Sequence, residues 1–240
     1  MSNLYPDGHK GGYRLPMKED KAYMSVGAFQ CPVCKADFKA LKIRDVKLIP
    51  LRIGELRTAF KDVEPLYYEI TTCPKCFYSA QTILFDKIIF SHRKMILERL
   101  APFLPSLSPW LETPNSDAVF ERYYLALQCA AVGFSDHALV EAGLWLKLSN
   151  IYADAEDREM EQYAAAEAQK TYITAFQTVR IPPQKNPSLC LRAGMLSVKI
   201  GDLRTARDFL YKVKVDVNST RVQKDAADDA INDLKAAEAK

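Results

Sequence analysis

The pattern of hydrophobic positions divides the chain into two regions with different expected secondary structure. In the first region, apolar runs rich in β-branched and aromatic residues at 46–51 and 66–72 predict two strands. Pro50 places the first strand at a sheet edge or at a strand end. A short helix is predicted over 92–100, before a proline-rich connector at 101–109. The first region is therefore predicted to be a small unit with a β component.

From residue 116 onward the apolar positions repeat at helical spacing. The predicted helices lie at 116–133, 138–152, 160–177, 189–200, 203–213 and 224–240. Glycine, charged and proline-rich breaks separate them, and Gly201-Asp202 combines a helix stop with a new cap. Successive amphipathic helices with short breaks predict antiparallel helix pairs.

Helix pairs of this kind invite comparison with the tetratricopeptide repeat. Its first helix needs a large residue, a leucine, a small residue and a tyrosine at set offsets, which are met by Trp145, Leu148, Ser149 and Tyr152. The repeat also has a small residue at the helix contact, a glycine at the turn and an alanine in the second helix. Gly194, Gly201 and Ala206 occupy these positions. The intervening segment is irregular, so a generic antiparallel helical bundle is the alternative. The predicted fold class is mostly α, with tetratricopeptide-like antiparallel helix pairs after a small β unit.

Four cysteines in two Cys-Pro-x-Cys turns carry the clearest chemical signal. They are Cys31, Cys34, Cys73 and Cys76. Proline restricts the shape of each turn, and the two-residue gap lets both sulfurs face one point. Four thiolates complete a tetrahedral shell without an open position, which favours a structural zinc ion over a catalytic one. These cysteines are therefore predicted to bind one zinc ion within a ribbon that needs the metal to fold.

The same four cysteines also fit two other roles. A rubredoxin-like iron centre also uses four thiolates, and a thiol redox switch is a further alternative. Cys129 and Cys190 lie on apolar helical faces and are predicted to be buried and inert. His92 could replace a ligand, although a surface helix position is favoured. His9 and His137 have no acid or cysteine partner nearby in the sequence and are assigned no role.

The two regions and the connector define four predicted segments. They are a flexible leader at 1–20, a zinc-ribbon domain with short helices at 21–104, a linker at 105–115 and a tetratricopeptide-like helical domain at 116–240.

The formal net charge of +3 is distributed unevenly. Residues 1–100 carry a net charge of +6, and residues 101–240 carry −3. The positive excess is densest between the cysteine turns, at Lys35, Lys39, Lys42, Arg44, Lys47, Arg52, Arg57 and Lys61. A basic head of this kind is either a solvated face, which we favour, or a contact for nucleic acid.

The chain shows neither the apolar core of a signal peptide nor a run long enough to span a membrane. We therefore expect a cytoplasmic protein without membrane insertion. In that compartment paired cysteines indicate metal ligands rather than disulfides.

The cysteine turns, the Tyr-Glu-hydrophobic strand before the second turn and the helical run resemble a known bacterial family. The matching stretches are Cys31–Phe38, Pro65–Ala80 and about Phe120 to Val213. The family is the one named domain of unknown function twenty-two twenty-five. The resemblance implies a cytoplasmic bacterial protein with a zinc-ribbon head, tetratricopeptide-like helices and no established activity. Such turns usually continue with glycine, whereas Lys35 and Phe77 stand here, so we expect a cost in backbone conformation.

The sequence contains no zinc-protease, phosphate-loop, dinucleotide-binding or nucleophile-elbow motif. We therefore expect a non-enzymatic zinc-binding adaptor whose helical surface binds a protein partner. The alternative is a nucleic-acid-binding protein that uses the basic ribbon. A rubredoxin-like iron redox protein is a more distant alternative.

Overall fold

The computed structural model describes residues 3–17 and 22–238, and within these ranges it is mostly helical with a small β head. The strands are β1 (Met24–Gln30), β2 (Asp37–Ile43), β3 (Pro50–Ile53), β4 (Thr58–Phe60), β5 (Ile70–Thr72) and β6 (Ser79–Gln81). The helices are α1 (Arg93–Leu100), α2 (Ser116–Gly133), α3 (His137–Asp154), α4 (Arg158–Thr178), α5 (Asn186–Ile200), α6 (Leu203–Val215) and α7 (Arg221–Glu238). The predicted class, mostly α with a small β unit, is confirmed, and the tetratricopeptide-like repeat stays a prediction.

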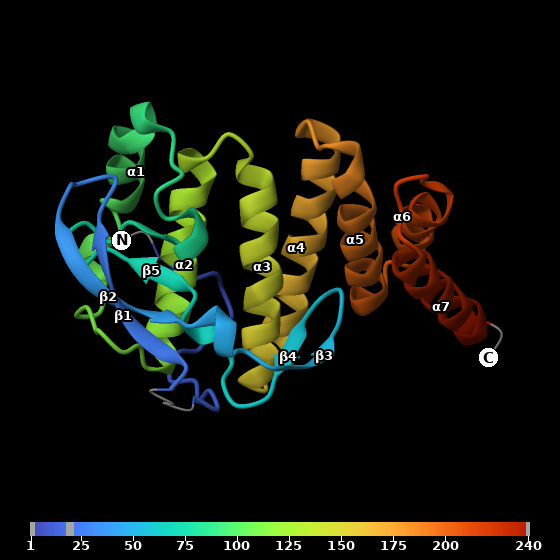
Figure 1. Cartoon of the computed structure of the whole chain (residues 1–240), viewed down its shortest axis with the longest axis horizontal. Coiled ribbons are helices and arrows are strands. Elements are labelled where there is room, and N and C mark those ends of the chain that lie inside the picture. The colour runs from blue at the N-terminus through green and yellow to red at the C-terminus, as the bar shows by residue number, and fades with distance from the viewer. Residues whose placement is uncertain (1–2, 18–21, 239–240) are drawn as a thin grey trace.

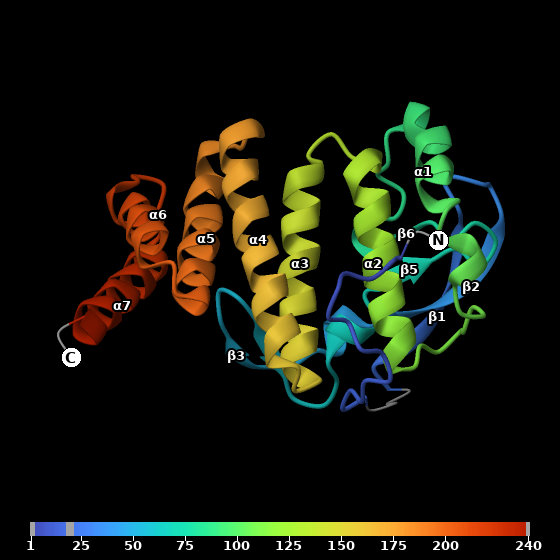
Figure 2. The ribbon, with the colours of Figure 1, turned by 180° about the vertical axis from the view of Figure 1, so that it is seen from behind.

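The helices form a row, and the strands lie beside its N-terminal half. Figure 1 shows α2, α3, α4 and α5 side by side, with α6 and α7 at the C-terminal end. The strands pair as three separate antiparallel hairpins, β1–β2, β3–β4 and β5–β6. Hairpin β5–β6 packs against α2, and Figure 2 shows the row of helices from the opposite side. Within the described ranges, no helix has both the length and the apolar character needed to cross a bilayer.

Local capping explains where several helices begin and end. The Asp202 side chain accepts a hydrogen bond from the Thr205 backbone N–H at 3.2 Å and so begins α6. Gly201 ends α5 with a φ of 83°, a left-handed conformation that glycine adopts without steric cost. Asn115 caps α2 through the Ala118 N–H at 2.8 Å. These local signals account for the agreement between predicted and observed helices to within a few residues.

Two hydrophobic clusters hold the molecule together. The first joins the cysteine turns and the β5–β6 hairpin to α1, α2, α3 and the start of α4, and it includes Tyr78, Phe120 and Tyr152. The second joins α3 to α7 and includes Ala142, Leu196 and Leu210. Ribbon and helix residues therefore share one core across the predicted linker, while most of the helical row has a core of its own. The predicted domain limits stay a prediction.

The strand predictions need correction. Residues Asp45–Lys47 form a 3-10 turn with Val46 exposed, and β3 begins only at Pro50. Pro65 starts a second 3-10 turn, supported by the Glu64 side chain, so β5 is confined to Ile70–Thr72. The backbone N–H and C=O groups of each turn form hydrogen bonds within the turn. They are therefore not available to pair with a neighbouring strand.

The segment predicted to be a flexible leader packs against the helices over residues 3–17. Leu4 is buried in the first cluster. His9 Nδ1 forms a hydrogen bond with Tyr152 Oη at 2.7 Å, and Lys10 Nζ donates to Asp157 at 3.1 Å. The backbone N–H of Gly12 donates to the Asp117 side chain, and that of Leu15 donates to the Ser116 hydroxyl. The remaining leader residues, 1–2 and 18–20, lie outside the described residues, as do residues 239–240 of the predicted last helix.

Candidate metal centre

Each Cys-Pro-x-Cys turn closes a β-hairpin, and the two turns have the same backbone pattern. In the first, the Cys31 N–H donates to the Ala36 carbonyl at 2.9 Å, and the Lys35 N–H donates to the Cys31 carbonyl at 3.0 Å. In the second, the corresponding bonds run from Cys73 to Tyr78 and from Phe77 to Cys73, both at 2.9 Å. Because β1–β2 and β5–β6 frame these turns in the same way, both present two sulfurs to a common point.

The four sulfurs form a compact cluster that could hold a metal ion. The Sγ atoms of Cys31, Cys34, Cys73 and Cys76 all lie within 4.8 Å of one another. Two pairs that bridge the turns, Cys31 with Cys76 and Cys34 with Cys73, are 3.6 Å apart. A tetrahedral ion with metal–sulfur bonds of about 2.3 Å places its ligands about 3.8 Å apart. The spacing therefore matches a four-thiolate shell, and none of these cysteines is in a disulfide.

Burial and mutual hydrogen bonds shift the pKa values of the thiols in this cluster. Cys31, Cys73 and Cys76 are buried, and Cys34 is partly exposed. Hydrogen bonds from Cys31 and Cys76 lower the pKa of Cys73, with additional bonds from backbone N–H groups of its own turn. The hydrogen bond that Cys31 shares with Cys73 raises the pKa of Cys31, and burial raises it further. A bound cation would favour the four deprotonated sulfurs.

The residue after each cysteine pair has a left-handed backbone, as expected. Lys35 has a φ of 65° and Phe77 a φ of 57°. The turn accepts this conformation because the same residue donates the hydrogen bond that closes it. Phe77 also packs against the first cluster, whereas the Lys35 side chain is exposed. A substitution at Lys35 therefore tests the backbone strain of the turn without changing the packing of the core.

Replacing Lys35 with glycine should stabilise the metal-loaded protein. The left-handed conformation costs an L-residue about 1–2 kcal/mol, and glycine removes this cost. Glycine also loses about 0.5–1 kcal/mol more chain entropy on folding, so we expect a net gain of up to about 1.5 kcal/mol. The measurement is the urea midpoint of the zinc-loaded protein. Lys35→Ala removes the same side chain without relieving the strain and should show no gain. Equal midpoints for the two variants would contradict this explanation.

The other cysteines and histidines have structural partners. Cys129 and Cys190 are buried as predicted, and burial raises the pKa of Cys129 to about 12 and of Cys190 to about 11. His92 bonds the Val132 carbonyl at 2.7 Å and ties α1 to the end of α2. His137 does have an acidic neighbour in the sequence, contrary to the prediction. Its Nδ1 atom lies 2.9 Å from the carboxylate of Glu141, one helical turn away.

His9 also has a partner, although a distant one in the sequence. Its ring stacks on Tyr5 and contacts Phe120, Tyr124 and Tyr152. Burial lowers the pKa of His9 to about 4 against the smaller opposing effect of nearby carboxylates. The neutral ring is therefore part of the packing that fixes the N-terminal segment.

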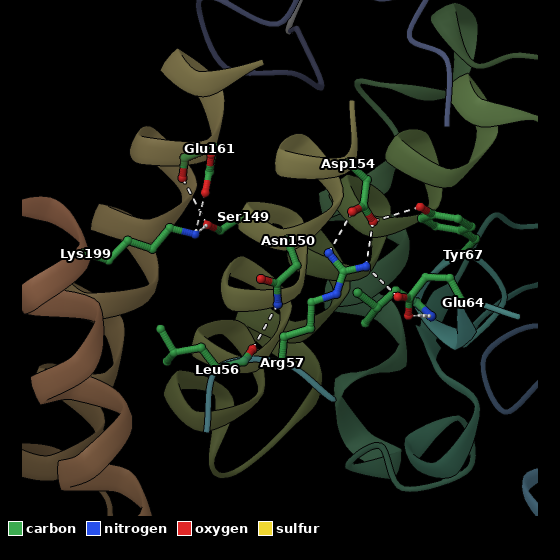
Figure 3. A network of polar contacts seen from close by, with 10 residues as sticks. Leu56, Arg57, Glu64, Tyr67, Ser149, Asn150, Asp154, Glu161 and Lys199 are labelled. Atoms are coloured by element: carbon green, nitrogen blue, oxygen red, sulfur yellow. Dashed lines mark hydrogen bonds and ion pairs between the residues drawn. The ribbon is translucent and has the colours of Figure 1, made fainter. Parts of the chain in front are cut away.

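A polar clamp, which sequence reasoning missed, joins the ribbon to α3. The Arg57 guanidinium bonds both carboxylate oxygens of Asp154, at 2.7 and 2.9 Å, and one oxygen of Glu64 at 2.5 Å. Figure 3 shows Tyr67 donating to the same Asp154 carboxylate, at 2.8 Å. Burial opposes the charge of Arg57, but the two carboxylates outweigh it and raise its pKa. Arg57 is therefore engaged within the protein and does not belong to the free basic face.

Further contacts reinforce this attachment along α3. Asn150 donates to the Leu56 carbonyl at 2.9 Å, and Lys147 pairs with Glu69 at 2.5 Å. On the other side of α3, Lys199 of α5 reaches Glu161 at 2.7 Å and Ser149 at 3.0 Å (Figure 3). The hairpin β3–β4 and the region before β5 are thus fixed to the helical row.

These features define a class of protein in which a four-cysteine, ribbon-like head is built onto a row of antiparallel helices. The chain belongs to the family described as "Uncharacterized protein conserved in bacteria (DUF2225)", which matches residues 25–237. The match includes both cysteine turns and almost all of the helical row, and it confirms the family resemblance seen in the sequence. Searches of curated proteins and of solved structures found no match to the chain.

Proposed function

We propose that this protein is a non-enzymatic adaptor that one structural zinc ion stabilises and that binds a protein partner on its helical row. The cysteine cluster supports the zinc part, because its closed set of four thiolates leaves no position for a substrate. The observation that carries the binding part is a groove along α3 between neighbouring helices and the β3–β4 hairpin. Concave surfaces on stacked helix pairs suit extended peptides.

Zinc is the proposed ion, and iron is the alternative. Freshly purified, reduced protein should contain one zinc per chain, since four cysteines complete one tetrahedral shell. Elemental analysis measures both metals in the same sample. Iron in place of zinc would favour the rubredoxin-like centre, and protein without either metal would refute a structural metal.

Partner binding can be tested with the full chain. Chemical crosslinking in bacterial lysate, followed by purification and mass spectrometry, should yield a protein in a stoichiometric complex that nuclease treatment leaves intact. Failure to capture any stoichiometric protein would argue against the adaptor.

Nucleic-acid binding is the second candidate, because the basic face is exposed. Seven of the eight cations around the cysteine turns are exposed, and only Arg57 is held by the clamp described above. A shift assay over a salt series tests it, since phosphate contacts weaken steeply with salt. Retention of RNA or DNA in moderate salt, with loss on Lys39→Glu and Lys42→Glu, would replace the adaptor proposal.

A further inference from the structure

The groove along α3 consists of two hollows that meet. The first has a volume of about 610 Å³ and lies among the start of α3, the end of α4 and the start of α5. The second, of about 330 Å³, lies between the β3–β4 hairpin and the middle of α3. Tyr172 and Arg192 line both hollows, so the hollows are adjacent, and together they are called the α3 groove. Figure 1 shows the hairpin beside α3 and α4.

One face of α3 forms the wall of the groove. Its lining positions recur every three or four residues, so they lie on one side of the helix. They are Asp136, Leu139, Gly143, Leu146, Lys147 and Asn150. From Asp136 to Asn150 the helix axis rises about 21 Å, which equals the length of about six residues of extended chain. The groove therefore matches a short extended peptide in length.

Gly143 keeps the middle of this wall open. A side-chain carbon built at Gly143 would meet no atom within 4 Å. Most helical glycines cost stability relative to alanine, and this one has no close packing that requires it. The missing side chain leaves room in the second hollow, which Leu146 and Tyr172 also line.

The two ends of the groove differ in charge. At the hairpin end, the cations Arg57 and Lys147 are paired with Glu64 and Glu69. The three cations of the first hollow are exposed, and none forms an ion pair with another described residue. They are Arg180, Lys185 and Arg192, of which Arg192 also lines the second hollow and hydrogen-bonds to Tyr172. Asp136 is the single acidic residue that lines this end, which leaves a positive excess beside apolar surface.

We propose that the α3 groove binds an extended acidic segment of a partner protein, of about six residues, with its carboxylates at the end formed by Arg180, Lys185 and Arg192. This proposal rests on the adaptor function and names the chemistry of its partner. Apolar side chains of the segment would cover Leu139, Ile181 and Leu189. A nucleic-acid strand fits less well, because the cations at the hairpin end, Arg57 and Lys147, are already paired with Glu64 and Glu69 and do not continue the positive charge along the groove.

The test uses a displayed library of random hexapeptides, selected on the zinc-loaded full chain. Selected peptides should be enriched in Asp and Glu relative to the starting library, alongside apolar residues. A fluorescein-labelled copy of the most enriched peptide is then used for anisotropy. Combined replacement of Arg180, Lys185 and Arg192 by glutamate should weaken its binding at least about tenfold, since an attractive charge pattern becomes a repulsive one. Gly143→Gln, which fills the groove, should weaken binding independently.

A matched control changes the same residue types away from the groove. Arg158, Arg204 and Lys235 are exposed and do not line either hollow, and their combined replacement by glutamate should leave binding within about twofold. Selected peptides without an acidic excess, or binding that survives charge reversal in the groove, would overturn the proposal. Oligouridylate that binds the wild-type chain and is lost on the same charge reversal would assign the groove to a phosphate backbone instead.

The adaptor proposal can fail separately from this one. A crosslinked partner that is still captured by the groove variants would show an adaptor that uses another surface. A wild-type chain that captures no partner in stoichiometric amount would refute the adaptor itself.

Discussion

Replacing Cys73 with serine should release the metal and unfold the β1–β2 and β5–β6 hairpins. Structural zinc contributes an apparent binding free energy of about 10–16 kcal/mol in small zinc domains, which is as large as the whole stability of an ordinary domain. β5 and β6 have three residues each and pack on α2, whereas β1–β2 contacts this pair through β2 and β5. Without the ion, three crowded thiols would remain with no cation between them.

Most of the helical signal should survive this change. The second hydrophobic cluster, from α3 to α7, contains no ribbon strand and keeps its own buried residues. Far-ultraviolet circular dichroism and elemental analysis measure helix and metal in the same sample. Cys190→Ser makes the same chemical change inside the second cluster and should retain the zinc. If Cys73→Ser abolished most of the helical signal, the two halves would form one cooperative unit and the boundary near Pro105 would be wrong.

The cysteine cluster and the helices could be predicted from sequence because their signals are local. Each cysteine turn holds its two sulfurs within four residues, and the left-handed backbone at Lys35 and Phe77 follows from the position after the second cysteine. Helix ends are likewise decided by neighbouring residues, as at Gly201 and Asp202. The fold class therefore followed from short-range patterns.

Strands β1 and β2 and the polar clamp could not be predicted, because the sequence near them does not indicate them. β1 and β2 pair across the first cysteine turn and include Gly27, Ala28 and Lys39, so their sequence has little β propensity of its own. Arg57 meets Asp154 across 97 positions in the sequence, and nothing near either residue indicates the other. In the sequence Arg57 is one more cation of a basic stretch, and only the fold shows that it is already paired.

Replacing Gly194 with glutamine should destabilise the helical row strongly, whereas the same change at Gly143 should not. A side-chain carbon at Gly194 would lie 2.8 Å from Leu210 Cγ and 3.3 Å from the Leu210 backbone nitrogen, so α5 and α6 would have to separate. Overpacking of this kind costs about 1–3 kcal/mol, and a buried amide without a partner adds about 1–3 kcal/mol.

The gain in helix propensity, at most about 1 kcal/mol, offsets only part of this cost, so Gly194→Gln should lose about 1–5 kcal/mol. Gly143→Gln has the same propensity gain without any clash, because its side chain enters the open α3 groove. It should be neutral or more stable by up to about 1 kcal/mol. Urea unfolding of both zinc-loaded variants measures the difference. Similar losses at the two positions would show that Gly143 is packed and that the α3 groove is closed in solution.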